Sequence, residues 1–80
     1  MIDLREIEIA IEEVRAELKE ATLTHGSFKS AHEGYAVILE EADELWEEVK
    51  KKKSLRDRGA LREEAMQVAA MAIRFMVDCT

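Results

Sequence analysis

Apolar residues recur every three or four positions along most of this chain, which is the spacing of an amphipathic helix. In the first segment the recurring apolar residues are Ile7, Ile11, Val14, Leu18 and Ala21. No stretch alternates apolar and polar residues for long enough to predict a β-strand, and the chain contains no proline. The pattern therefore predicts an all-α protein.

Three residues that can cap a helix N-terminus divide this pattern: Asp3, Ser30 and Asp57. Ser30 is followed three positions later by Glu33, and Asp3 by Glu6, which is the spacing of a capping box. We therefore expect helices over residues 4–22, 31–53 and 60–78, joined by a turn at 23–29 and a connector at 54–59. The expected architecture is a three-helix antiparallel module, with residues 1–80 forming a single domain.

The third predicted helix is apolar around more than half of its circumference. Its two apolar faces contain Leu61, Ala65, Val68, Ala69, Ala72, Phe75, Met76 and Cys79, and Met66, Ala70, Ile73 and Val77. The polar residues are confined to a strip that contains Glu63, Glu64, Gln67, Arg74 and Asp78, with Met71 among them. A helix of this kind is buried on two sides, and a chain this short buries only about 60% of its unfolded surface. We therefore expect a homodimer or homotetramer that completes a helical bundle.

The second predicted helix separates its acidic residues into two sets. Its apolar stripe contains Tyr35, Ile38, Ala42, Leu45, Trp46 and Val49, and we expect the two aromatic residues to pack in the core. Glu40, Asp43 and Glu47 lie on the far side, whereas Glu41, Glu44 and Glu48 border the stripe. Like charges at this spacing repel one another unless a cation compensates. An antiparallel third helix would bring Glu64, Gln67 and Asp78 to the same border.

Carboxylates from two facing helices are ligands that suit a hard cation, Mg²⁺ or Mn²⁺, with substrate phosphate in the remaining positions. The net charge of -6 argues against nucleic acid as a partner. No apolar run reaches the roughly 18 residues of a membrane span, and the first residues do not have the pattern of a signal peptide. We expect a cytoplasmic protein that does not bind membranes.

The acidic motif resembles a known enzyme family. Glu40-Glu41-Ala42-Asp43-Glu44, followed by Arg62-Glu63-Glu64-Ala65-Met66-Gln67, is similar to the EExxE and ExxD motifs of the MazG-like all-α nucleoside triphosphate pyrophosphohydrolases. The segments 32–39 and 67–72 also look like the small phage and bacterial members, so the likeness covers residues 28–78. The resemblance implies Mg²⁺-dependent cleavage of a nucleoside triphosphate into the monophosphate and pyrophosphate. The family module has four or more helices, so oligomerisation would supply the remaining contacts.

Carried over by position, the resemblance implies roles for individual residues. Glu41, Glu44 and Glu64 fall where the family places metal ligands, and Gln67 occupies the fourth ligand position, where the usual residue is Asp. Glu40 or Glu44 would orient the attacking water. The candidate substrate contacts are Glu48, Lys53, Arg74, Asp78 and Phe28.

Two other functions fit the same sequence. A non-catalytic assembly or regulatory module would keep the fold without the chemistry, and Gln67 supports this alternative because an amide has no negative charge. A nucleotide-binding or metal-binding bundle would bind the ligand without releasing pyrophosphate. Lys53 belongs to a lysine run at a predicted helix C-terminus, where the helix dipole alone favours cations.

Overall fold

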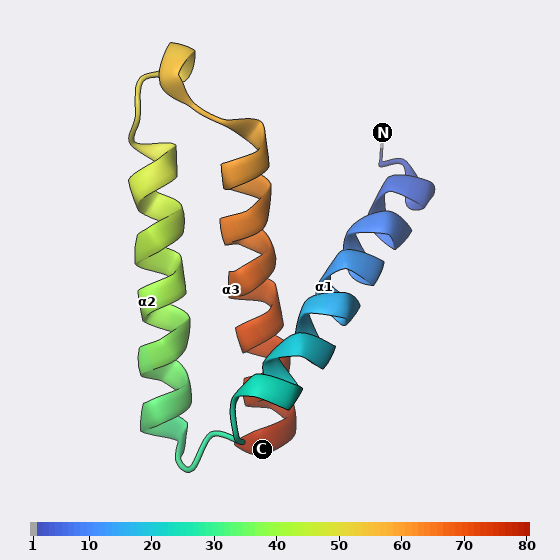
Figure 1. Cartoon of the computed structure of the whole chain (residues 1–80), viewed down its shortest axis with the longest axis vertical. Helices are drawn as coiled ribbons and strands as arrows, with labels where there is room; N and C mark the ends of the chain where they lie inside the picture. The colour runs from blue at the N-terminus through green and yellow to red at the C-terminus, as the bar shows by residue number, and fades with distance from the viewer. Residues whose placement is uncertain (1) are drawn as a thin grey trace.

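The computed structural model describes residues 2–80, which form three α-helices and one short 3₁₀ turn (Figure 1). The elements are α1 (Leu4–Thr24), α2 (Ala31–Val49), η1 (Lys53–Leu55) and α3 (Arg58–Asp78). Helices α2 and α3 run antiparallel side by side, and α1 packs against α3 on its other side. Within the described residues α1 and α2 share no packing contact, so α3 is the central helix. The all-α prediction is confirmed, since residues 2–80 contain no strand.

All three helices begin at the capping residues that the sequence indicated. The Asp3 side chain accepts a hydrogen bond from the Arg5 amide at 2.9 Å, and Ser30 Oγ accepts one from the Glu33 amide at 3.1 Å. Asp57 Oδ1 accepts hydrogen bonds from two amides of the first turn of α3. Each side chain thus satisfies backbone donors that have no partner inside the helix.

The helix ends differ from the predicted boundaries. Helix α2 ends at Val49 and not near residue 53, because Arg56 Nε donates to the carbonyl oxygens of Val49 at 3.0 Å and Lys51 at 3.1 Å. Those hydrogen bonds satisfy carbonyl groups that an ending helix leaves unpaired. Helix α1 extends two residues beyond its predicted end, and α3 starts two residues before its predicted beginning. No helix in residues 2–80 is long and apolar enough to cross a membrane.

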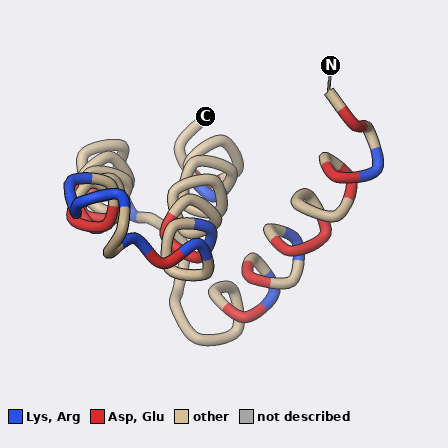
Figure 2. The backbone as a smooth tube through the Cα atoms, turned by 90° about the horizontal axis from the view of Figure 1, so that it is seen from above, with Lys and Arg blue, Asp and Glu red and all other residues tan. Residues whose placement is uncertain are grey.

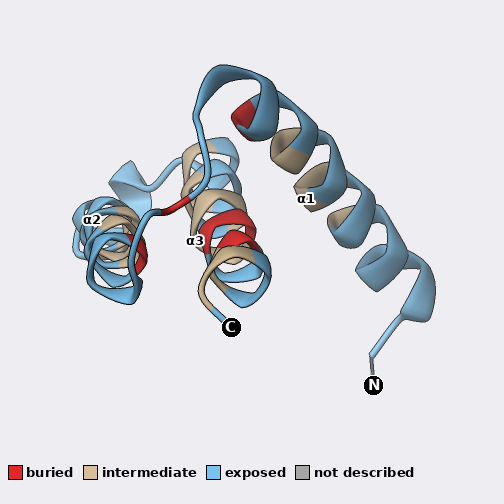
Figure 3. Cartoon of the chain, turned by 90° about the horizontal axis from the view of Figure 1, so that it is seen from below, coloured by how far each residue is buried: buried red, intermediate tan, exposed pale blue. Residues whose placement is uncertain are grey.

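The core lies where the loop between α1 and α2 crosses α3 (Figure 3). Its buried residues are Ala21, Phe28, Ala70 and Met71, with Arg74 buried beside them. Arg74 Nη2 donates to the Gly26 carbonyl at 2.5 Å, and its guanidinium lies 4.4 Å from the centre of the Phe28 ring. At the end of α3, Asp78 Oδ2 accepts a hydrogen bond from the Phe28 amide at 2.9 Å. Two side chains of α3 therefore fix this loop.

The polar strip assigned to α3 is buried or half-buried except at Glu63, and part of the apolar surface of α3 faces solvent. Met71 and Arg74 are buried, whereas Met76 is 66% exposed and Val77 is 74% exposed. The core positions expected for Tyr35 and Trp46 are wrong for a single chain, because these side chains are 62% and 57% exposed. The reason is that, within residues 2–80, α2 packs on α3 and on Phe28 of the loop and has no helix on its other side.

Gly34 marks the closest approach of α2 to the core. A Cβ atom at this position would lie 2.7 Å from Phe75 Cδ2, 3.1 Å from Phe28 Cδ2 and 3.3 Å from Cys79 Sγ. The first distance is far below a van der Waals contact. The absence of a side chain at Gly34 therefore sets the distance between α2 and α3.

We predict that Gly34→Ala destabilises the protein by about 1–2 kcal/mol, because overpacking exceeds the gain of up to about 1 kcal/mol in helix propensity. Chemical denaturation followed by circular dichroism measures the change. Gly26→Ala is the matched control, since nothing lies within 4 Å of its added Cβ and its φ is not positive. A Gly34→Ala variant more stable than the parent would contradict the close packing.

Candidate metal centre and adjoining cavity

Three carboxylates converge between α2 and α3. Glu41 and Glu44 lie one turn apart on α2, and Glu64 lies on the facing side of α3. One carboxylate oxygen of each residue lies within 4.8 Å of those of the other two. This convergence follows from the antiparallel helix pair, which places the start of α3 beside the second half of α2 (Figure 1).

The cluster carries negative charge that no neighbouring group neutralises. Oε2 of Glu41 and Oε2 of Glu64 are both buried without a hydrogen-bond partner. None of the ion pairs found in residues 2–80 involves Glu41, Glu44 or Glu64. A carboxylate oxygen buried without a donor is costly, so this arrangement is electrostatically unfavourable without a cation.

This environment changes the proton affinity of two of the three groups. Burial raises the pKa of Glu41 from 4.5 to about 7, with further contributions from the negative charges of Glu44, Glu64 and Glu40. Burial also raises the pKa of Glu64, together with the nearby charges of Glu44, Glu48 and Glu63. In both cases the cause is loss of solvation combined with like-charge repulsion.

The three residues fit a hard divalent cation. Oxygen atoms that coordinate Mg²⁺ at about 2.1 Å lie at most about 4.2 Å from one another. Neighbouring oxygens around Mg²⁺ lie about 3 Å apart, so the carboxylate oxygens of the cluster, which lie within 4.8 Å of one another, need to close by less than about 2 Å to reach that geometry. Mg²⁺ and Mn²⁺ prefer oxygen ligands, and the cluster offers three carboxylates. Two of these carboxylates have a buried oxygen without a hydrogen-bond partner.

Gln67, the predicted fourth ligand, lies one turn beyond Glu64 on α3. Its amide Nε2 is 3.5 Å from Glu63 Oε1, a long hydrogen bond along the surface of its own helix. It borders the same cavity as Glu41. The fourth ligand role of Gln67 therefore stays a prediction.

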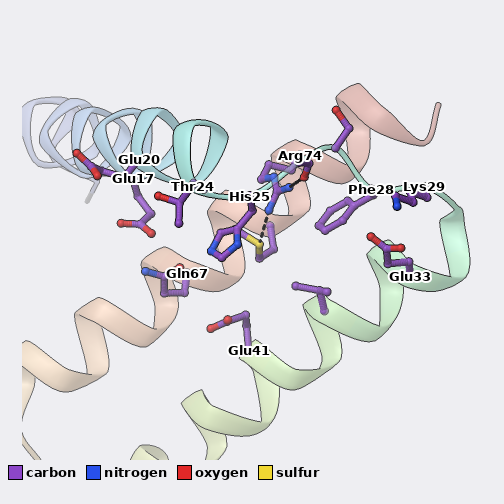
Figure 4. Close-up of a pocket in the computed structure, with 15 residues that line it drawn as sticks. Glu17, Glu20, Thr24, His25, Phe28, Lys29, Glu33, Glu41, Gln67 and Arg74 are labelled. Atoms are coloured by element: carbon purple, nitrogen blue, oxygen red, sulfur yellow. Dashed lines mark hydrogen bonds between the residues drawn. The ribbon is translucent and has the colours of Figure 1, made fainter.

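An open cavity of about 740 Å³ adjoins the cluster at Glu41 (Figure 4). Its walls come from the C-terminal part of α1, the following loop, α2 and α3. Figure 4 shows Glu41, Gln67 and His25 pointing into the same space from three different segments. Basic side chains at the cavity are Lys29 and the buried Arg74. Glu17, Glu20 and Glu33 also line the cavity, so its acidic groups outnumber its cations and an anionic ligand there would need a bound metal ion.

Two of the candidate substrate contacts border this cavity but also take part in the core. Arg74 has guanidinium hydrogen atoms left for a ligand, because within the described part of the chain it donates to the Gly26 carbonyl and Met71 Sδ alone. Phe28 is 7% exposed, and the Arg74 guanidinium covers its ring. Asp78 accepts a hydrogen bond from the Phe28 amide and borders a second cavity of about 520 Å³, which Arg74 also lines.

The remaining candidates lie away from the cavity. The Glu48 carboxylate pairs with Lys51 Nζ at 2.9 Å, although its charge still acts on Glu64. Lys53 starts η1 in the basic connector beyond α2 (Figure 2). Glu40 is exposed on α2 and acts on Glu41 through its charge. Their proposed roles stay predictions.

Several cavity residues were missed by reasoning from the sequence, among them three titratable side chains near the end of α1. Glu17 and Glu20 line the cavity from α1, and His25 lines it from the loop. Glu17 and Glu20 flank Ala21, the one buried residue of α1, so their position beside the apolar stripe was the available signal. His25 gave no signal, because its position depends on how the loop is fixed to α3.

The fold and the site together define an all-α protein with a three-carboxylate candidate metal centre. Comparisons with family models, curated proteins and solved structures find no match to this chain. A functional assignment therefore rests on the residues and the geometry of the site.

The raised pKa of Glu41 predicts how stability depends on pH in metal-free protein. Between pH 4.5 and about 7 the folded chain binds a proton at Glu41 that the unfolded chain has lost. The free energy of unfolding therefore falls as pH rises through this window. Because solvent screens the cluster, we expect a loss of about 1–2 kcal/mol.

Urea denaturation at pH 5 and pH 8 in EDTA measures this loss. Glu41→Gln should remove most of the pH dependence attributable to the cluster. Asp43→Asn is the control, because Asp43 is exposed on the same helix and forms no ion pair within residues 2–80. If the free energy of unfolding depended on pH equally in the parent and in Glu41→Gln, Glu41 would not be the source of the dependence.

Proposed function

We propose that this chain is a Mg²⁺-dependent nucleoside triphosphate pyrophosphohydrolase of the MazG-like type, which cleaves a (d)NTP to the (d)NMP and pyrophosphate. The observation that carries the proposal is the cluster of Glu41, Glu44 and Glu64 with its unpaired buried oxygens. The adjoining cavity supports it, because a ligand there would lie between the cluster and the cationic Arg74. The sequence resemblance independently gives these three residues the same role.

In this proposal Glu41, Glu44 and Glu64 hold the cation. When bound, Mg²⁺ supplies charge neutralisation for the phosphate oxygens and lowers the pKa of a coordinated water. The more exposed Glu44, or the neighbouring Glu40, accepts the proton of the water that attacks the α-phosphorus. The bond from this phosphorus to the oxygen bridging to the β-phosphate breaks, and pyrophosphate leaves.

The cations of the cavity act on the other end of the substrate. Arg74 donates hydrogen bonds to phosphate oxygens through the guanidinium hydrogens that the loop carbonyl does not use. Lys29 adds positive charge at the cavity border. In this proposal the two groups act together with the bound cation, because the glutamates that line the cavity alone would repel a polyanionic substrate.

The proposed functional form is a homodimer or homotetramer that completes a helical bundle. The exposed Tyr35, Trp46, Met76 and Val77 support this part of the proposal, because a single chain leaves them without neighbours. A second copy would bury surface that a protein of this size does not normally expose.

Gln67 favours a second candidate, a metal-binding or nucleotide-binding module without hydrolysis. Its amide contacts Glu63 and contributes no negative charge to the cluster. A cluster of this kind would bind a cation less strongly than one with four carboxylates. Cation binding without pyrophosphate release would identify this alternative.

We expect pyrophosphate release from one or more members of a panel of NTPs and dNTPs in Mg²⁺, and none in EDTA. Glu41→Gln should lower turnover at least about 100-fold by removing a ligand, with unchanged helical content by circular dichroism. Asp43→Asn should keep the parent activity, since Asp43 is exposed on the far side of α2. Parent-like turnover in Glu41→Gln would exclude the assigned site.

Gln67→Asp should tighten Mn²⁺ binding by about tenfold, because it adds a fourth carboxylate one turn from Glu64. Isothermal titration calorimetry without nucleotide measures the affinity. Gln67→Asn is the matched control, with the same side-chain length as Asp and no charge. Equal affinities in the two variants would place residue 67 outside the metal's coordination sphere.

A further inference from the structure

A single copy of this chain exposes more surface than its mass predicts. Its accessible surface is 6332 Å², whereas a compact 9.2 kDa monomer is expected to expose about 4,900 Å². Its radius of gyration is 13.7 Å, compared with about 11.6 Å for a compact domain of this length. The excess of about 1,400 Å² is larger than the roughly 800 Å² that each partner buries in a standard interface.

Helix α1 packs on α3 but leaves apolar surface exposed along its length. Figure 1 and Figure 3 show α1 leaning away from the helix pair toward its N-terminus. An apolar groove of about 500 Å³ lies between α1 and α3, with walls that include Ile7, Ile11, Val14, Leu18, Ala69 and Ile73. Ile11 is 51% exposed and Ile73 is 39% exposed. This groove is distinct from the cavity beside the carboxylates.

Charged residues flank the apolar stripe of α1 on both borders. Arg62 of α3 forms a bidentate pair with Glu13 of α1, through Nε at 2.7 Å and Nη2 at 3.2 Å. This pair joins the two helices on one side of the apolar stripe, while Arg15 lines the groove on the opposite side. An incoming element therefore enters along the Arg15 border.

We infer that α1 of a second copy of this chain fills the groove. The two α1 helices would run antiparallel about a two-fold axis near Ile11, so that each helix covers the groove of the other copy. An isologous contact of this kind uses one surface twice, and it buries the apolar stripe that α1 leaves half exposed.

The charges along α1 fit this antiparallel pairing. Glu8 and Arg15 are seven residues apart, about two turns, and lie on the same border of the apolar stripe. With the axis near Ile11, Arg15 of one copy lies opposite the partner's Glu8, and the reciprocal pair forms at the other end.

The mass of the full chain, measured by sedimentation equilibrium without nucleotide from about 1 to 200 µM, tests this inference. We expect a dimer, and a thermal midpoint that rises with protein concentration. Ile11→Arg should raise the dimer dissociation constant about 100-fold or more, because it places a charge in the buried stripe. Ile9→Arg is the matched control, since Ile9 is 56% exposed on the opposite side of α1 and should leave dimerisation unchanged.

A charge exchange tests the register and does not depend on the stability of Ile11→Arg. Arg15→Glu and Glu8→Arg should each weaken the dimer, and the double variant should restore it. A single-copy mass with a concentration-independent thermal midpoint would overturn the inference, as would a dimer lost in Ile9→Arg but kept in Ile11→Arg. Failure of the double variant to restore dimerisation would overturn the antiparallel register. None of these results depends on hydrolysis or on metal binding.

Discussion

The attachment of the loop between α1 and α2 to the C-terminal half of α3 determines the arrangement of the whole chain. Arg74 holds the Gly26 carbonyl and covers the Phe28 ring, and Asp78 holds the Phe28 amide. A buried guanidinium is stable here because it is hydrogen-bonded and stacked on an aromatic ring. This attachment places α1 and α2 on opposite sides of α3 and leaves them without mutual contact.

The packing of α2 on α3 produces the carboxylate cluster, and repulsion within the cluster destabilises that packing. Close packing at Gly34 brings α2 near α3, and the same approach brings Glu41 and Glu44 to Glu64. The buried oxygens of Glu41 and Glu64 have no donor, so the chain stores like-charge repulsion that protonation or a cation relieves. Such local conflict is typical of functional sites and is unusual in a surface that serves only stability.

The small core explains why two surfaces of the chain remain apolar. The buried hydrophobic residues of the described chain are Ala21, Phe28, Ala70 and Met71, two of which are alanines. A core of this size contributes little hydrophobic free energy, and conformational entropy opposes folding along the whole chain. Apolar surface remains exposed at the groove between α1 and α3 and at the aromatic residues of α2. A second copy that covered these surfaces would add hydrophobic free energy that the single chain lacks.

The sequence by itself determined the three helices and their starts, because capping side chains and helical periodicity act over a few neighbouring residues. It also grouped Glu41 with Glu44, since one turn of α2 places them on one face. The tertiary structure alone decided that Gln67, Met71 and Arg74 lie on an inward side of α3, because a polar residue is buried only when distant partners satisfy it. It likewise decided that α2 ends at Val49, where Arg56 satisfies the last carbonyls, and that Trp46 faces solvent. Those outcomes depend on contacts between residues far apart along the chain, which no local pattern specifies.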